Sequence, residues 1–378
     1  MSLIPTLSWN IFSIFFFILC FVGSVQLLFV LMIHSRLAFF KGKKSSENPI
    51  EIPVSIIIAA RNESDNLYEN LPSILAQDYP NFEVIVVNNQ SIDDSSWLLN
   101  AFCREYPNLK VVELGKNKHL RPGKKLSITL AIKGAKYEHF ILTDADCKPA
   151  SNQWLRQMAG TFSNTKQVVL GYGPSTVQKG FLNKVVRFDT AWIGVNYMSM
   201  ALARLPYMGV GRNLAYTKTV FESVNGFKSH YGLPSGDDDL FIQEAARKSN
   251  YTIQIDPATY CFSPPPNTWK TWQRQKNRHY STSSRYKFIK KSLLGIYPLS
   301  LLLMWISFVI LLCNFSWVII ASIIFGFILL IKWILQARCL LKLHEKGFVW
   351  AFPLWDLGYA ILAPMMYYIS DRKRYYKW

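Results

Sequence analysis

Two long apolar tracts, one near each end of this 378-residue chain, limit its possible folds more than any other feature. The first covers residues 9–33, and every polar residue in it is uncharged. An apolar stretch of about 25 residues can cross the roughly 30 Å hydrocarbon layer of a bilayer as a helix. The basic residues at positions 36–44 follow this tract, which favours a retained anchor over a cleaved signal peptide. We therefore expect residues 1–35 to form an N-terminal transmembrane anchor.

The second tract, residues 293–331, is interrupted near Asn314 and is long enough for two closely connected spans. Lysine and arginine collect on the cytoplasmic side of membrane segments. Here they flank both ends of the tract: Lys287, Lys290 and Lys291 before it, and Lys332, Arg338 and Lys342 after it. The pattern predicts a transmembrane hairpin over 293–331 whose two ends face the cytoplasm.

A third apolar stretch, residues 348–370, contains Pro353, Asp356 and Pro364 and precedes three basic residues at 372–374. A full crossing would place that basic cluster outside the cell, against the positive-inside tendency. We expect a third membrane segment that is re-entrant or lies in the interface, with a kinked span as the alternative.

The net charge of +18 is concentrated beside the membrane tract. No acidic residue occurs between Asp256 and Glu345, and basic residues crowd the approach to the second tract. They are Lys270, Arg274, Lys276, Arg278, Arg285, Lys287, Lys290 and Lys291. This distribution is typical of a surface that lies on anionic lipid, or of topology signalling alone. We expect an anionic membrane as a partner, and no nucleic acid.

The six cysteines form no Cys-x-x-Cys pair and show no regular spacing, so neither a zinc site nor a disulfide framework is indicated. The basic cluster at 36–44 places the region between the tracts on the cytoplasmic side. We therefore expect a multi-pass protein of the inner cell membrane whose globular domain lies in the reducing cytoplasm.

Residues 50–265 alternate short apolar runs with helical patterns, which is typical of an α/β domain. Strands are expected at 54–58, 84–87 and 140–142, and with weaker patterns at 111–114, 168–170 and 252–255. Helices near 66–76, 97–105 and 125–135 fall between strands, which predicts a mostly parallel sheet. The tripeptide at 264–266 is three prolines and marks the domain boundary, after which we expect a basic interfacial helix over 266–292.

Three polar turns follow predicted strands, and they contain the residues best suited to chemistry. They are Arg61-Asn62-Glu63, the segment 88–94, and Asp144-Ala145-Asp146. Ligands bind open α/β sheets at the carboxyl ends of the strands, so we expect these turns to converge on one rim.

The acidic pair at the end of the apolar run 139–143 suits a divalent metal ion bound to a diphosphate. A hard cation held by carboxylates and phosphate oxygens neutralises charge on a leaving diphosphate. We expect Asp146 to be the direct metal ligand and Asp144 to contact the ribose, or the metal through water. The alternative is that the two acids cap the next helix.

Two later clusters complete the set. Residues 236–239, Gly-Asp-Asp-Asp, precede a helix-like segment, so they can supply a base beside an acceptor hydroxyl or an N-cap for that helix. Gln275, Arg278 and His279 are spaced i, i+3 and i+4, which places them on one helical face. Arg278 can bind a diphosphate through its planar fork, and Lys124 offers a point charge to the same group or is a solvated surface lysine.

In this order the motifs resemble those of the inverting, membrane-associated family 2 glycosyltransferases of GT-A fold. That family includes cellulose, chitin and hyaluronan synthases and ceramide glucosyltransferase. The resemblance covers about residues 50–290, and it implies Glu63 and Asn88 in nucleotide binding and residues 123–125 at the diphosphate. It implies metal binding at 143–146, and it aligns Gln275, Arg278 and His279 with the family's Gln-x-x-Arg-Trp motif.

The resemblance further implies that Asp238 is the catalytic base and Asp237 its orienting neighbour, with the assignment among the three consecutive aspartates open by one position. Two departures affect specificity. Asn88 stands where the family often has an aspartate that recognises uracil, and His279 replaces the usual tryptophan. The first departure leaves the identity of the nucleotide's base open, and the second leaves open whether an aromatic platform is present.

The expected activity is inverting transfer of one sugar from a nucleotide-diphosphate sugar, with UDP as the expected nucleotide and Mn²⁺ or Mg²⁺ as cofactor. A single hairpin beyond the domain is poorly suited to a polymer channel, and the nearby membrane tract favours a lipid-linked or amphiphilic acceptor. The apolar segment 181–205 could line an acceptor groove, or it could be core. The alternatives are a processive polysaccharide synthase and a membrane-anchored nucleotide-binding scaffold without turnover.

Overall fold

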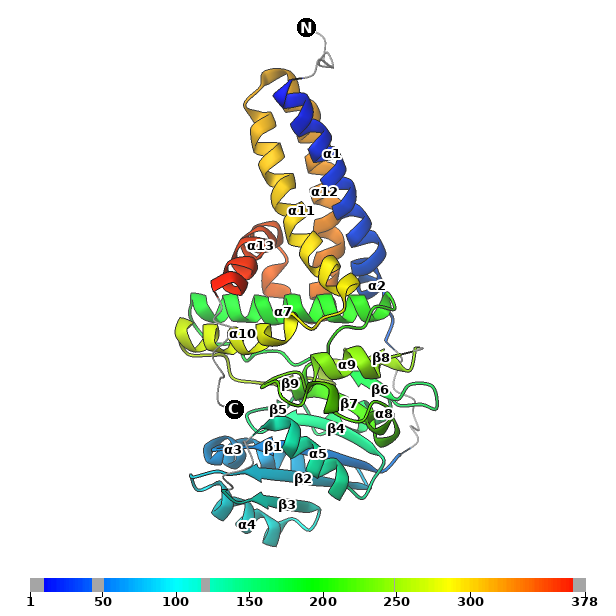
Figure 1. Cartoon of the computed structure of the whole chain (residues 1–378), viewed down its shortest axis with the longest axis vertical. Coiled ribbons are helices and arrows are strands. Elements are labelled where there is room, and N and C mark those ends of the chain that lie inside the picture. Colours follow the sequence, from blue (N-terminus) through cyan, green and yellow to red (C-terminus); the bar gives the residue numbers. More distant parts are fainter. Residues whose placement is uncertain (1–9, 43–50, 117–122, 248, 370–378) are drawn as a thin grey trace. The chain divides into compact units, whose positions relative to one another are not determined.

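The structure is a computed structural model that describes residues 10–42, 51–116, 123–247 and 249–369 (Figure 1). It contains two compact units, which divide after Phe40 and again between Tyr286 and Lys287. One unit is helical and the other contains the sheet.

The α/β unit is built on a seven-stranded sheet of order β3-β2-β1-β4-β7-β6-β8. Strands β3, β2, β1 and β4 are parallel to one another, β7 is antiparallel to β4 and β6, and β8 is parallel to β6. The strands are β1 Val54–Ala60, β2 Phe82–Asn89, β3 Leu109–Leu114, β4 His139–Asp144, β6 Val168–Leu170, β7 Leu214–Thr217 and β8 Tyr251–Ile253. The mostly parallel GT-A sheet expected from the sequence is confirmed.

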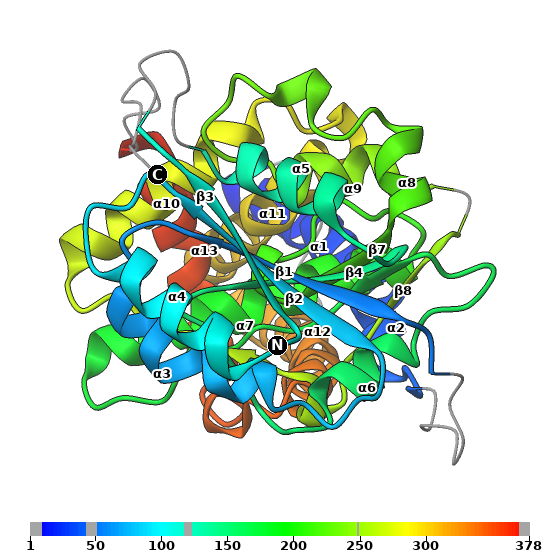
Figure 2. The same ribbon diagram turned by 90° about the horizontal axis from the view of Figure 1, so that it is seen from below.

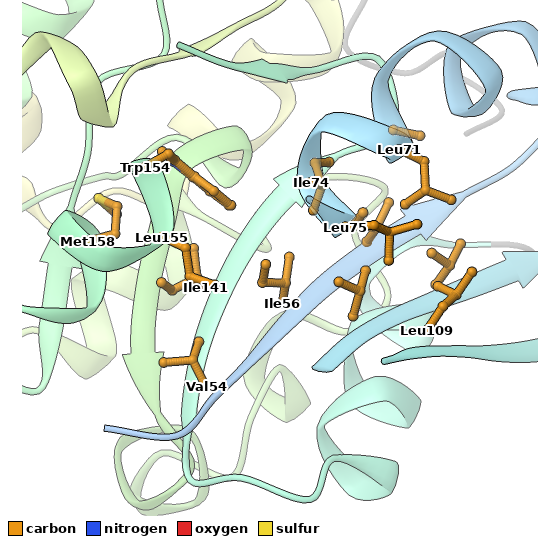
Figure 3. Packing of buried hydrophobic residues seen from close by; sticks show 14 of the residues in the cluster. Val54, Ile56, Leu71, Ile74, Leu75, Leu109, Ile141, Trp154, Leu155 and Met158 are labelled. Carbon is orange, nitrogen blue, oxygen red and sulfur yellow. The ribbon is translucent and has the colours of Figure 1, made fainter. Parts of the chain in front are cut away.

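Helices cover both faces of the parallel part of the sheet. Alternate residues of β1 pack with α3 (Ser64–Leu75), α4 (Ser95–Glu105) and α6 (Trp154–Ala159) in one buried cluster. Figure 3 shows Ile56 of β1 among Leu71, Ile74 and Trp154 in this cluster. Helix α5 (Lys124–Gly134) lies on the opposite side of β1 and β2 (Figure 2). Burial of both faces explains why every residue of β1 except Ser55 is apolar.

The remaining strands and α-helices of this unit follow β4 in the chain. They are β5 (Lys148–Pro149) paired with β9 (Cys261–Phe262), α7 (Phe181–Leu202), α8 (Lys218–Ser223), α9 (Asp239–Ala245) and α10 (Trp269–Ser283). Helix α7 buries Trp192, Val195, Tyr197 and Met198. Of the two alternatives for this apolar stripe, an acceptor groove or core, the burial of these side chains supports core.

The helical unit contains three described helices that are long and apolar enough to cross a membrane. The first spans Ile11–Ala38, in which α1 (Ile11–Phe29) continues through a π-helical turn (Val30–His34) into α2 (Ser35–Ala38). The others are α11 (Phe288–Leu312) and α12 (Phe315–Lys342), and Asn314 between them caps α12 through its side chain.

The third apolar stretch forms α13 (Phe352–Ile369), with Pro364 inside the helix. Lys332, which was expected to follow the membrane hairpin, lies within α12, and this helix continues ten residues past it, to Lys342. Its side chain is buried and pairs with Asp356 of α13, at 3.4 Å between Nζ and Oδ2. The pairing explains how two charges are accommodated in otherwise apolar helices.

Candidate active site

The carboxyl ends of three parallel strands form the rim of the site. Ala59 of β1 is paired in register with Asp144 of β4, and Ala60 with Asn88 of β2. The turns after β1 and β2 are bonded to each other: the Ile92 N–H donates to Asn62 Oδ1 at 2.8 Å. The convergence of the polar turns predicted from the sequence is confirmed.

Asp144, Asp146 and Cys147 place one ligand atom each within 4.8 Å of one another, a group that could hold a metal ion. Burial, and then the charge of Asp144, raise the pKa of Asp146. Burial also raises the pKa of the Cys147 thiol, which donates to Asp146 Oδ1 at 3.2 Å. The two carboxylates repel each other, and a hard cation would relieve that repulsion, so the donor set fits Mn²⁺ or Mg²⁺.

The alternative that this acidic pair caps a helix is wrong. The next helix is α6, which begins at Trp154, and its N-cap is Gln153. Asp144 ends β4 and Asp146 lies in the turn that follows. Both carboxylates therefore belong to the strand edge.

Lys124 joins the metal motif to the second acidic motif. It is the first residue of α5, and its ammonium lies 2.6 Å from Asp144 Oδ1 and 3.2 Å from Asp237 Oδ2. Although burial disfavours its charge, these carboxylates hold its pKa above the ordinary value. The side chain is only 16% exposed, so the surface-lysine alternative is wrong.

The backbone leaves room for this junction at Gly211. A Cβ atom there would lie 2.9 Å from Lys124 Nζ and 3.4 Å from Asp237 Oδ2. Because Gly211 has no side chain, the backbone turn that precedes β7 can lie directly against the ion pair.

The three consecutive aspartates have different partners. Asp237 pairs with Lys124, and despite burial its pKa is lowered by that ammonium and by Arg278. Asp238 Oδ2 accepts a hydrogen bond of 3.1 Å from the Gly211 N–H. Burial, with the charges of Asp237 and Asp239, raises the pKa of Asp238 to about 7. Asp238 also caps α9, because its Oδ1 accepts a hydrogen bond of 2.8 Å from the Asp239 N–H, so the N-cap alternative holds.

Asp239 points to a different part of the unit. Its Oδ2 accepts hydrogen bonds from the Thr282 hydroxyl and, at 2.7 Å, from the Tyr286 hydroxyl. Thr282 lies in the last turn of α10. Asp239 therefore anchors the end of α10 and is less suited than Asp238 to act on a ligand.

Helix α10 carries Gln275, Arg278 and His279, the first two half-buried and the third exposed. The helix runs beside α7 (Figure 1), where buried Lys276 forms an ion pair with Asp189. The expectation that Lys276 lies on anionic lipid is therefore wrong. Pairing in the interior satisfies its charge.

In the turn after β2, where nucleotide binding was predicted, the Asn88 side chain is buried and already hydrogen-bonded within the protein. The Asn88 amide is buried and donates to Ser96 Oγ at 2.9 Å and to Glu113 Oε2 at 3.0 Å. Glu63 is half-buried, and burial followed by nearby Asp146 and Asp144 raises its pKa. Asn88 thus helps to hold the carboxylate of Glu113, an exposed residue at the end of β3, in position.

Sequence reasoning missed Glu113, Gly211 and Arg212. Arg212 follows Gly211 in a short 3-10 turn before β7, and its charge acts on Asp144 and Asp146. The run Gly209-Val210-Gly211-Arg212 was a usable signal, because closely spaced glycines beside an arginine allow a backbone to approach a ligand.

Family comparisons agree with this geometry. The sequence model for "Glycosyl transferase family group 2" matches residues 139–363, which is more than half of the chain, and that for "Glycosyl transferase family 2" matches residues 55–221. The chain belongs to glycosyltransferase family 2. Both models describe families of glycosyltransferases.

Curated relatives of this glycosyltransferase are similar over part of their length. The "Probable glycosyltransferase YdaM" of Bacillus subtilis is 26% identical over 65% of this chain and 59% of its own length. A poly-beta-1,6-N-acetyl-D-glucosamine synthase of Staphylococcus epidermidis is 25% identical over 68% of this chain and 61% of its own. The chain thus spans about six-tenths of these relatives.

A solved structure confirms the fold. The mannosyltransferase PcManGT of Pyrobaculum calidifontis, in complex with GDP-Man and Mn²⁺, has a TM-score of 0.55 and 18% identity. The similarity covers 92% of this chain and 98% of that chain. At this identity the comparison concerns the fold alone.

Proposed function

We propose that this glycosyltransferase moves a single sugar, with inversion, from a nucleotide-diphosphate sugar to a membrane lipid or lipid-linked acceptor. The observation that carries the proposal is the junction of Asp144, Lys124 and Asp237, which brings the metal motif beside Asp238. The residues proposed to bind the donor and those proposed to act on the acceptor are thereby linked by ion pairs through Lys124.

Asp146 and Asp144 would hold the divalent ion. When bound, that ion neutralises charge on the departing diphosphate. Burial and then the charge of Asp144 raise the pKa of Asp146, and a bound cation would remove the second of these causes, which supports this assignment. Arg278 and Lys124 would add positive charge to the same group, with Gln275 and His279 on the same face of α10.

Asp238 would accept the proton of the acceptor hydroxyl. The hydroxyl oxygen then forms a bond to the anomeric carbon while the bond from that carbon to the phosphate oxygen breaks, and its electron pair leaves with the diphosphate. A base with a pKa of about 7 is half-ionised at neutral pH, near the optimum for proton transfer. Asp237, held by Lys124, would orient it.

The nucleotide base would be recognised at the turn formed by Glu63, Asn88 and Glu113. The exposed Glu113 carboxylate can accept a hydrogen bond from the N–H of an imide such as uracil, and UDP is our proposed nucleotide. Guanine also presents N–H donors, so a panel of sugar nucleotides tests this assignment.

The acceptor side is inferred from the surface at the N-terminal ends of α7 and α10. Val177, Phe181 and Trp269 are 72%, 67% and 49% exposed, and the two rings lie 6.4 Å apart between centroids. Exposed Lys179 and Lys270 flank them. Apolar and basic side chains together suit an anionic bilayer surface. We infer a position on the cytoplasmic face of the inner cell membrane.

A processive synthase is the second candidate, because polysaccharide synthases are among the relatives. A defined primer separates the two: single transfer gives one added sugar at any donor excess, and a processive enzyme gives a ladder or a long product. A scaffold without turnover would release no nucleoside diphosphate.

The first test measures nucleoside diphosphate release by purified protein in lipid, with a panel of sugar nucleotides and lipid extracts. Mn²⁺, Mg²⁺ or a chelator is added in parallel. We expect chelator-sensitive release from one donor, lost in Asp238→Asn and retained in Asp65→Asn, an exposed carboxylate of α3. Turnover by Asp238→Asn equal to wild type would refute the assignment of the base.

A further inference from the structure

Arg212, in the 3-10 turn before β7, has a guanidinium group that forms no ion pair with a described carboxylate. Its only side-chain hydrogen bond to a described residue is donated by Nη1 to the Ser263 hydroxyl. None of the described carboxylates lies within ion-pair distance of it, although Asp144 and Asp146 act on its charge. A guanidinium has five N–H donors, so most of its donor capacity is left over.

The surroundings of Arg212 hold it in place. A Cβ atom at Gly173 would lie 2.5 Å from both Cγ and Cδ of Arg212, so the arginine stem lies directly against the backbone there. Replacing that glycine would therefore displace the stem.

The residues on either side of Arg212 are also fixed. The Gly211 N–H donates to Asp238, and the Asn213 amide donates to the carbonyls of Tyr172 and Thr259 at 2.8 and 2.7 Å. Trp154 Nε1 donates to Asn213 Oδ1 at 3.1 Å. The arginine is thus presented from a rigid backbone between the base and the core.

A partly buried guanidinium without a countercharge is unfavourable unless a ligand supplies one. Cys147, Asp144 and Asp146 act on the charge of Arg212, and the two aspartates are those that would hold the metal ion beside the diphosphate. The planar fork of arginine matches the two oxygens of a phosphate.

We propose that Arg212, in the 3-10 turn before β7, is a second arginine of the donor site and binds a phosphate oxygen of the nucleoside diphosphate, in addition to Arg278 on α10. This inference rests on the proposed function. It assigns to Arg212 a binding role that strengthens as charge develops on the leaving diphosphate, so kcat as well as KM depends on it.

The test compares affinities for nucleoside diphosphate and monophosphate in wild type, Arg212→Lys and Arg212→Gln, using full-length protein in lipid with Mn²⁺. A hydrogen bond to a charged group contributes about 1.5–3 kcal/mol, so we expect diphosphate binding to weaken about 10- to 100-fold in Arg212→Gln. Monophosphate binding should change less. Added guanidinium ion should restore part of the lost turnover.

Two further variants keep the result interpretable. Gly173→Ala retains the charge but displaces the arginine stem, and it should weaken diphosphate binding in a protein that still has Arg212. Arg156→Gln, which removes a partly exposed arginine paired with Glu51, is the matched control and should leave binding unchanged.

The outcomes are distinct. If wild type binds a nucleoside diphosphate and folded Arg212→Gln and Gly173→Ala bind it equally well, the role of Arg212 is refuted and the proposed function stands. If wild type binds none, both fall.

Discussion

Lys124 Nζ lies 2.6 Å from Asp144 Oδ1, and this ion pair joins the first turn of α5 to the end of β4. The same ammonium reaches Asp237 at 3.2 Å. One side chain therefore balances two acidic motifs that are far apart in the sequence.

Lys124→Met should abolish most transfer activity and also lower the melting temperature. Removing the ammonium leaves Asp144 and Asp237 without their countercharge, and breaking a buried pair costs about 3–5 kcal/mol. Initial rates and thermal unfolding in the same lipid check this. Lys133→Met changes an exposed lysine at the far end of α5 and should alter neither measurement. A normal rate in Lys124→Met would contradict the role of the junction.

The pH dependence of kcat/KM should reflect Asp238. The base must be ionised, so the rate should rise about tenfold per pH unit below neutrality and level off above an apparent pKa of about 7. In Asp238→Asn the residual rate should be about 10²- to 10⁴-fold lower and lack this titration. A flat profile in wild type would exclude Asp238 as the base.

The same carboxyl should lower stability at high pH. Its folded pKa of about 7 lies above the ordinary value of 3.8, so the folded protein binds the proton more tightly than the unfolded chain. The resulting stabilisation is complete below the ordinary value and is lost as pH rises through about 7. Asp238→Asn should therefore melt higher than wild type at pH 8, with a smaller difference at pH 5. Thermal unfolding at the two pH values measures the change.

The end of α10 should loosen when Asp239 loses its partners. The double variant Thr282→Val with Tyr286→Phe removes both hydroxyl donors from a buried carboxylate, at a cost of about 1–3 kcal/mol for each lost hydrogen bond. Hydrogen exchange in the peptide covering 269–286 should become faster. Ser281→Ala removes a hydroxyl that bonds only within α10, and it serves as the control. Unchanged exchange in the double variant would show that the anchor is unimportant.

The helical unit should depend on the Lys332 and Asp356 pair. Both are almost fully buried, and Tyr297 donates to Asp356 at 2.8 Å. Asp356→Asn strands the lysine charge and should lower thermal stability in detergent, whereas Lys332→Met with Asp356→Leu should recover much of it. Lys346→Met, at an exposed lysine, is the control. Equal melting of the single and double variants would argue against a paired charge.

Local sequence determined most of the elements. Short β-branched runs bounded by polar turns predicted β1, β2 and β4 because a strand buried on both faces is mostly apolar. The apolar tracts and the break at Asn314 predicted the spans for an equally local reason: the bilayer sets a minimum apolar length. The sequence did not predict that α12 continues past Lys332, whose charge is paired with Asp356 of α13.

The candidate residues were also identifiable from the sequence, but the separate contacts of each residue were not. Three adjacent aspartates are equivalent in the sequence, and only the folded chain gives Asp237 a lysine, Asp238 a backbone N–H and Asp239 two hydroxyl groups. Each partner comes from a separate element. Likewise, α7 is core because neighbouring elements bury its aromatic stripe.

The sequence by itself determined the family, the parallel sheet and the apolar tracts that are long enough to span a membrane, because these depend on residue type, spacing and length. Only the tertiary structure decided which charges meet. Coulomb interactions and burial act over a few ångströms between segments that are distant in the chain, so Arg212 could be recognised only once β7 lay beside the carboxylates of β4.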